Sequence, residues 1–171
     1  MIITNNEEAL RIKCEDVLPD EVGELVATLE RELEYSARIG NPGIGLAAPQ
    51  CGIGKKIAIV RIDDIKLNLV NAELDQKFDL QMFRNEGCLS FPGRIEDTMR
   101  YQEITVKNNL IFPKKFVATG LVSVVIQHEL DHINGILLPD NVIKKNIKMK
   151  PNELCFCGSN IKYKKCHGRI K

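Results

Sequence analysis

The pentapeptide HELDH at residues 128–132 constrains this chain more than any other segment. On a helix, two histidines four residues apart project from the same face and can bind one divalent metal, with Glu129 beside the open position. The apolar segment 121–126 precedes the pair, which predicts a buried helix rather than a surface helix. Buried imidazoles next to a carboxylate need partners, and a metal ion supplies them. The pentapeptide therefore predicts a metal-dependent hydrolase.

The third ligand distinguishes the classes of enzyme that share this pattern, because a catalytic metal of this kind has three protein ligands and a water. A metzincin would have Gly at position 135 and His at position 138, and this chain has Gly135 but Leu138. Thermolysin-like enzymes take a carboxylate from a later helix. The candidates after the pentapeptide, Asp140 and Glu153, lie in short segments without helical periodicity. We therefore expect the third ligand upstream.

Two upstream segments complete a recognisable set of motifs. Residues 43–50 read GIGLAAPQ and residues 86–90 read EGCLS, and both precede QHELDH at residues 127–132. In this order and with this spacing the three segments resemble the motifs of the peptide deformylases. The resemblance implies a hydrolase that removes the N-formyl group from the N-terminal formyl-methionine of newly made polypeptides.

The resemblance also implies a ligand set and a proton carrier. Cys88, His128 and His132 would hold the catalytic metal, and Glu129 would move a proton from water to the departing amine. The resemblance implies Fe²⁺ in the cell and Zn²⁺ or Ni²⁺ in purified protein. The ligand types alone do not select the metal, because zinc binds more tightly than ferrous iron to such a site.

Further residues match positions that bind substrate or support the centre in the family. The Gln50 side chain and the Leu89 backbone N–H would stabilise the developing oxyanion. Glu86 and Arg100 match a pair that supports the segment around the metal-binding cysteine. Arg84 stands where many relatives have an apolar residue, so a more polar pocket rim is expected. The residues that would line the methionine pocket are Ile44, Gly45, Leu121, Val124 and Val125.

The pattern of apolar residues predicts an α+β fold. We expect a helix from about residue 20 to 38, strands near 57–62, 67–71, 86–89 and 103–108, and a helix from about 119 to 133. By the resemblance, antiparallel sheets would surround a central helix that carries HExxH. With 171 residues, the chain is long enough for one domain of about 140 to 150 residues and an appendage. We expect a catalytic domain at residues 1–143.

Nothing in the sequence indicates a membrane segment. No stretch approaches the roughly 18 uninterrupted apolar residues of a membrane span. The first eight residues lack the basic start and apolar core of an export signal. We therefore expect a cytoplasmic protein with no membrane partner.

Charge divides the chain into an acidic body and a basic tail. Residues 144–171 contain nine Lys and Arg and one acid, Glu153, whereas the preceding residues carry a net charge of −7. This asymmetry favours an anionic partner for the tail, and the implied substrate favours the ribosome and its RNA over DNA. A solvated tail that only keeps the protein soluble is the alternative.

The tail also contains a second set of metal-binding residues. Cys155, Cys157, Cys166 and His167 form a closed set of four ligands suited to structural zinc. Their segment resembles the SEC-C motif, a small zinc module, and 151–171 would form a zinc knuckle after a basic linker at 144–150. Because so short a segment buries little apolar surface, the metal would supply its folding free energy. A disordered tail is the alternative.

Three functional classes remain open at this level. The first is the deformylase, and the second is a different metal-dependent amidase or protease with the same catalytic residues. The third is a ribosome-associated metal-binding module without catalytic turnover, against which the intact Gln50, Cys88 and Glu129 argue.

Overall fold

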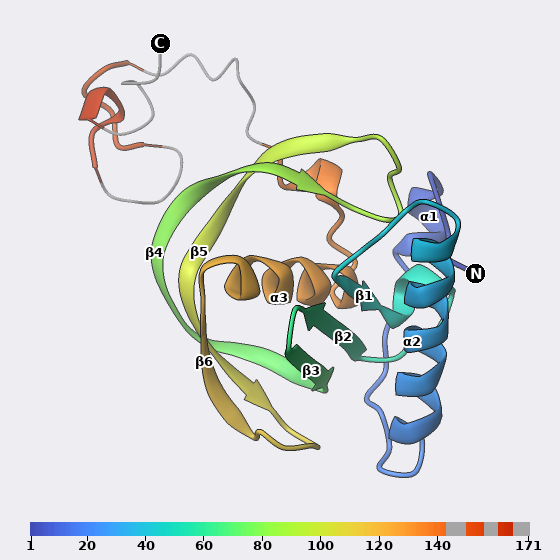
Figure 1. Cartoon of the computed structure of the whole chain (residues 1–171). Coiled ribbons are helices and arrows are strands. Elements are labelled where there is room, and N and C mark those ends of the chain that lie inside the picture. The colour runs from blue at the N-terminus through green and yellow to red at the C-terminus, as the bar shows by residue number, and fades with distance from the viewer. Residues whose placement is uncertain (143–149, 156–160, 166–171) are drawn as a thin grey trace.

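The computed structural model describes residues 1–142, 150–155 and 161–165 (Figure 1). None of the helices in these ranges combines the length and the apolar character needed to cross a membrane. Short 3₁₀ helices lie at Ala48–Cys51, Leu138–Asp140 and Tyr163–Lys165. The longer elements in chain order are α1 (Glu7–Leu10), α2 (Val22–Arg38), β1 (Gly45–Ala47), β2 (Ile57–Ile62), β3 (Ile65–Val70), β4 (Ala72–Gly87), β5 (Ile95–Asn108), β6 (Lys115–Thr119) and α3 (Gly120–Ile133).

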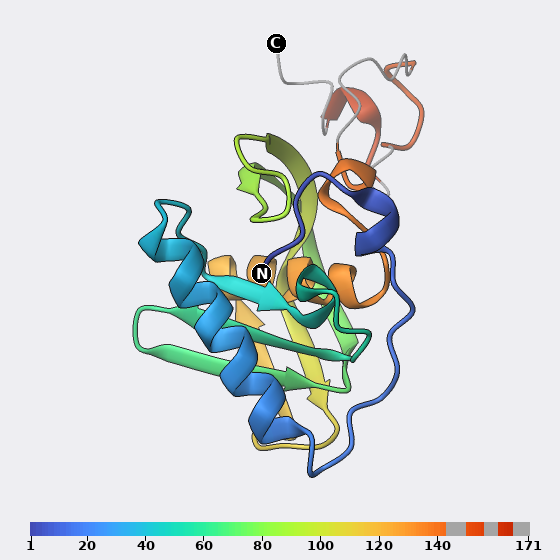
Figure 2. The ribbon, with the colours of Figure 1, turned by 90° about the vertical axis from the view of Figure 1, so that its right-hand side faces the viewer.

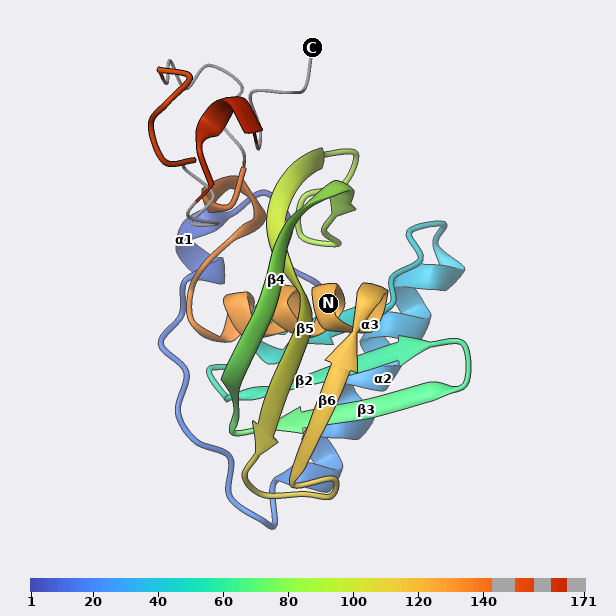
Figure 3. The same cartoon turned by 90° about the vertical axis from the view of Figure 1, so that its left-hand side faces the viewer.

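The strands form two antiparallel sheets of three strands each, with the orders β1-β2-β3 and β4-β5-β6. The prediction of an α+β fold with antiparallel sheets is confirmed. Helix α3 contacts strands of both sheets. Figures 1 and 3 show it between the long curved sheet and the smaller one. Residues of α3 are thereby withdrawn from bulk water, which suits a site that depends on electrostatics.

Strand β2 is apolar on both faces because it separates two parts of the core. Ile57 and Ile59 pack in the cluster that includes Leu29 of α2, whereas Ala58 and Val60 pack with residues of α3 such as Ile126. Successive side chains of a strand point to opposite faces, so each face of β2 contacts a different helix. Figure 2 shows α2 lying across the outer side of this sheet.

Helix α2 is amphipathic, and α3 is buried nearly all round. In α2 the fully or nearly buried apolar residues Leu29 and Leu33 are four positions apart on one face. Helix α3 ends with Gly135 in the left-handed conformation at φ +70°. There the N–H groups of Gly135 and Ile136 donate to the carbonyls of His132 and Asp131, which closes the last turn. The glycine thus ends the helix directly after its second histidine.

The structure differs from the predicted strands in extent. Strands β4 and β5 are far longer than the segments expected near 86–89 and 103–108, and β1 and β6 were not predicted. Much of β4 is exposed and rich in charged residues, so it lacks the apolar alternation on which the prediction relied. The expected strand at 86–89 is only partly present, because β4 ends at Gly87 and residues 89–90 form a turn.

Candidate metal centre

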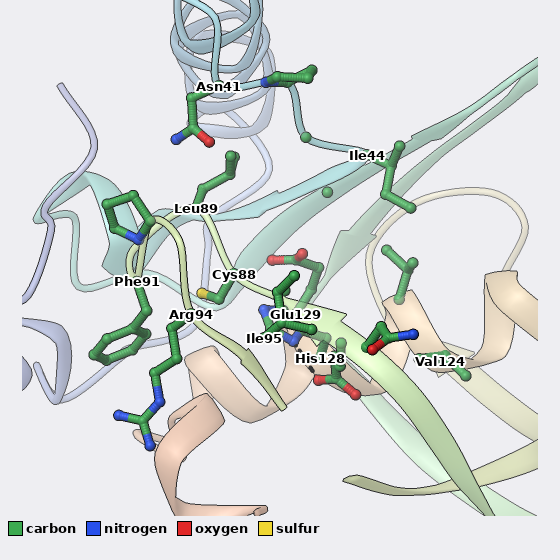
Figure 4. A pocket seen from close by; sticks show the side chains of 18 of the residues that line it. Asn41, Ile44, Cys88, Leu89, Phe91, Arg94, Ile95, Val124, His128 and Glu129 are labelled. Atoms are coloured by element: carbon green, nitrogen blue, oxygen red, sulfur yellow. Dashed lines mark hydrogen bonds and ion pairs between the residues drawn. The ribbon is translucent and has the colours of Figure 1, made fainter. Parts of the chain in front are cut away.

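The predicted metal ligands come from two places in the fold. Cys88 follows the last residue of β4 directly, and His128 and His132 lie one turn apart on the buried face of α3. The ligand atoms of these three side chains all lie within 4.8 Å of one another. Figure 4 shows Cys88 and His128 beside Glu129 at the base of a pocket. The structure brings together residues that are up to 44 positions apart.

The geometry and donor set of this cluster fit a divalent metal. Cys88 Sγ lies 3.2 Å from His132 Nε2, and the two imidazole rings stand edge to face with centroids 4.9 Å apart. Burial lowers the pKa of His132 well below its ordinary value, which favours the neutral imidazole that binds metal.

Glu86 fixes the orientation of His128. Its Oε1 atom accepts a hydrogen bond from His128 Nδ1 over 2.7 Å, which leaves Nε2 of the ring for a metal. Arg100 donates to both carboxylate oxygens, at 2.8 Å and 2.6 Å. Burial raises the pKa of Glu86, but hydrogen bonds from Arg100 and His128 outweigh it and hold the pKa well below its ordinary value. Glu86 is therefore a carboxylate that accepts hydrogen bonds.

Glu129 is buried beside the ligands without a protein donor for one of its oxygens. Its side chain is 3% exposed, and Oε2 makes no hydrogen bond to any described residue. Burial raises the pKa of Glu129 to about 7. A carboxylate without a fixed partner and with a pKa near neutrality can both accept and release a proton.

Gln50 is oriented by three contacts of its amide group. The Ala47 N–H donates to Gln50 Oε1 over 2.9 Å, so Nε2 points toward Ser90 Oγ at 3.2 Å and Cys88 Sγ at 3.8 Å. The Gln50 amide therefore presents a donor toward the metal ligands. The fully buried Ser90 was not predicted to have a role, although it belongs to the EGCLS motif.

A pocket of about 390 Å³ opens beside the ligands and contains the predicted substrate residues. In Figure 4, Ile44 and Val124 lie on one side of it, and Phe91 and Arg94 lie on the other. Arg84, expected at the rim, is exposed and does not line the pocket. The predicted substrate residues that line it are Ile44, Gly45, Leu121, Val124 and Val125. Its polar lining residues include Asn41, Asn85 and Arg94.

The tail is described only in part. Leu154 and Lys162 form an antiparallel bridge, and the N–H of the buried Cys155 donates to the Ile161 carbonyl over 2.7 Å. Among the expected zinc ligands, Cys157, Cys166 and His167 lie outside the described residues, as does most of the expected linker.

Three convergent ligands with an open direction and a buried carboxylate beside it define the class of metal-dependent hydrolases. A family model described as polypeptide deformylase matches residues 1–148, and one described as the SEC-C motif matches residues 152–169. The chain belongs to the polypeptide deformylase family. It is accordingly a hydrolase, a peptide deformylase.

Individual relatives agree with this assignment. A peptide deformylase from a Picosynechococcus species is 37% identical over 144 residues, which cover 80% of this chain and 75% of the relative. A peptide deformylase from Syntrophomonas wolfei is 36% identical over 150 residues, which cover 86% of this chain and 95% of the relative. The crystal structure of a peptide deformylase from Synechococcus elongatus in complex with actinonin has a TM-score of 0.74 and 34% identity, and covers 85% of this chain and 79% of that one. The crystal structure of the peptide deformylase from Thermotoga maritima has a TM-score of 0.72 and 30% identity, and covers 84% of this chain and 97% of that one.

Proposed function

We propose that this chain removes the N-formyl group from the N-terminal formyl-methionine of newly made polypeptides, with a metal bound in the pocket. Cys88, His128 and His132 hold one divalent metal at the base of the pocket. The observation that carries the proposal is the convergence of these three ligand atoms within 4.8 Å beside the buried Glu129. The helix with the HExxH motif supplies two ligands and the proton carrier from one buried face.

The metal, when bound, lowers the pKa of a water and polarises the formyl oxygen. We propose Fe²⁺ in the cell and Zn²⁺ or Ni²⁺ in purified protein. One thiolate and two imidazoles accept all of these ions, so availability decides the occupancy. The reaction takes place in the cytoplasm, where formylated chains are made.

Glu129 moves the proton in this proposal. The carboxylate accepts a proton from the attacking water and delivers it to the amine that leaves the formyl carbon. Its burial keeps bulk water from competing for that proton. The unpartnered Oε2 is available for the water.

Gln50 and Leu89 stabilise the negative charge that develops on the formyl oxygen. The Gln50 amide is held by Ala47 and Ser90, so its donor needs little reorganisation during the reaction. Leu89 follows Cys88 directly and lines the same pocket, and its backbone N–H serves as the second donor.

The methionine side chain enters the apolar part of the pocket. Val124 and Val125 are buried at its wall, whereas Ile44 and Leu121 are 42% and 46% exposed at its mouth. Apolar residues at the mouth become covered when an unbranched side chain binds between them, which favours methionine. Gly45 lets Glu129 and the substrate backbone approach closely.

The deformylase reaction can be distinguished from the second candidate, a different amidase or protease, by substrate choice. We expect formyl-Met-Ala-Ser to release formate while the internal amides of the same peptide stay intact. Mass spectrometry of the products measures both events in one reaction. Cleavage between Met and Ala at a comparable rate would favour the amidase or protease.

Substitution of Gly45 with Ala should lower the rate without unfolding the protein. A Cβ at this position would lie 2.3 Å from Glu129 Oε1, so the carboxylate must move. A displacement of about 1 Å can cost about 100-fold in rate. We expect kcat to fall at least about 10-fold. A small drop in melting temperature is also expected, because the Cβ would lie 3.0 Å from Val125 Cγ1. Gly23→Ala is the matched control, since a Cβ there has no atom within 4 Å. Equal kcat for both variants would contradict the role of Glu129.

We propose that residues 1–143 form the catalytic domain and that the tail, after the linker 144–150, brings it to the ribosome. Cys155, Cys157, Cys166 and His167 bind one structural zinc in the SEC-C module at residues 151–171. Lys162, Lys164 and Lys165 then give this folded module a cationic surface for ribosomal RNA. Formyl-methionine exists on nascent chains, so such contact raises the local concentration of substrate.

Deletion of residues 146–171 should separate catalysis from ribosome binding. We expect nearly unchanged turnover of formyl-Met-Ala-Ser, because every proposed catalytic residue precedes position 133. Co-sedimentation with ribosomes should weaken, and that of the full-length protein should fall steeply with salt, because phosphate contacts release counterions. The matched control for the deletion is the full-length variant in which Lys162, Lys164 and Lys165 are changed to Gln. It removes these three positive charges and keeps the proposed zinc ligands. Equal sedimentation of the deleted and intact proteins would contradict the RNA contact.

A further inference from the structure

Thr98, on β5, belongs to none of the three motifs but contacts the support of the metal centre. The residue is fully buried, and its hydroxyl donates to Glu86 Oε2 over 2.6 Å. Glu86 therefore accepts four hydrogen bonds, two on each oxygen, from Thr98, from Arg100 twice and from His128. Two donors on each oxygen fix the plane of the carboxylate, and the carboxylate in turn fixes the ring of His128.

Asn141 contacts the same network from the other side. Arg100 Nη1 donates to Asp131 Oδ2 over 2.5 Å, and Asn141 Nδ2 donates to the same oxygen over 2.9 Å. Asp131 lies between the two histidines on α3, and the sequence did not show in which direction it points. The structure shows that Asp131 accepts a hydrogen bond from Nη1, the guanidinium nitrogen of Arg100 that does not donate to Glu86. Asn141 therefore reaches Glu86 through Asp131 and Arg100.

The backbone around Asn141 is attached to the body of the protein on both sides. Asp140 accepts hydrogen bonds from Arg11 over 2.7 Å and 3.0 Å. Val142 forms an antiparallel bridge with Thr98. The segment 140–142 thus runs directly beside Thr98, whose hydroxyl donates to Glu86. Asn141 contacts the group of charges through Asp131, and the backbone of Val142 pairs with the residue that donates to Glu86.

We propose that Thr98 and Asn141 are positioning residues for the metal ligand His128, an inference that rests on the metal site proposed above. Thr98 orients Glu86 directly, and Asn141 orients it through Asp131 and Arg100. Glu86 and Arg100 are buried, so loss of one donor leaves a carboxylate oxygen less satisfied and allows Glu86 to turn. A turned Glu86 releases the His128 ring. The catalytic unit accordingly extends at least to Val142, near the end of the proposed catalytic domain.

The rate at which the full-length protein loses Co²⁺ to a chelator tests this proposal. Substitutions that remove such supporting contacts typically weaken metal binding about 10- to 100-fold. We expect Thr98→Val and Asn141→Ala each to speed the loss at least about 10-fold. Loss of Co²⁺ from the proposed catalytic site is the kinetic phase that Cys88→Ala lacks. This comparison distinguishes it from loss of metal from the tail. Thr98→Ser keeps the hydroxyl and should restore a rate close to that of the wild-type protein.

Two matched controls define the result that would overturn the proposal. Thr105→Val makes the same change at a buried position of β5, and Asn109→Ala removes one side-chain hydrogen bond far from Glu86. Loss rates of Thr98→Val and Asn141→Ala equal to those of their controls would refute the positioning role while leaving the metal site intact. Absence of the phase from the wild-type protein would instead refute the metal site itself.

Discussion

Replacement of Glu129 with Gln is expected to lower the deformylation rate at least about 100-fold, because proton transfer by a placed side chain typically contributes that much. Glutamine has nearly the same shape as glutamate but cannot accept the proton of water. The catalytic metal should stay bound, because Glu129 lies beside the proposed ligands Cys88, His128 and His132 and is not part of that cluster. The measurement is kcat with formyl-Met-Ala-Ser, together with the metal content of the same preparation.

Glu24→Gln, at an exposed position of α2, is the control for this substitution. It should leave both the rate and the metal content unchanged. Activity of Glu129→Gln within about 10-fold of the wild type would contradict a general acid-base role, since that contribution starts at about 100-fold. Loss of the metal from this variant would show instead that Glu129 supports the ligands.

The second large effect is expected from Cys88→Ala, which removes the one thiol among the proposed metal ligands. A site with two remaining imidazoles lacks the three protein ligands that catalytic zinc and iron sites use, so the ion should be lost. The proposed tail site shares no residue with this site. Metal analysis of the full-length protein should therefore fall from about two ions per chain to about one. Deformylation should fall to background.

Cys51→Ala is the matched control for the loss of a thiol. Cys51 is partly buried in the 3₁₀ helix after β1, burial raises the pKa of its thiol to about 11, and the residue is not part of the ligand cluster. This variant should retain both ions. If Cys88→Ala also retained two ions at full occupancy, Cys88 would not be a ligand.

The parts of the site that were predictable lie in short continuous motifs. The spacing of His128 and His132 places them on one face of a helix by geometry alone, and Gly135 marks where that helix ends. Cys88 and Gln50 were identified only through resemblance to a family. No periodicity relates them to the helix, because they come from distant parts of the chain. Cys88 is 44 positions from His132, and Gln50 is 38 positions from Cys88.

The parts that were not predictable depend on tertiary contacts between polar residues. Thr98 and Asn141 belong to residue types that are common on surfaces and in turns, and nothing in their sequence neighbourhood indicates a buried partner. Strand β4 has an exposed, charged sequence that resembles a loop. Its pairing with β5 along most of its length supplies the backbone hydrogen bonds that make it a strand.

Formate release from formyl-Met-Ala-Ser by anaerobically iron-loaded protein tests most directly whether this centre is catalytic. We expect formate to accumulate through many turnovers, with a rate proportional to the iron bound at the site that Cys88→Ala lacks. Cys88→Ala, loaded and assayed in the same way, should release formate only at background. If the fully iron-loaded wild-type protein released formate no faster than Cys88→Ala, the proposed deformylase function would be wrong.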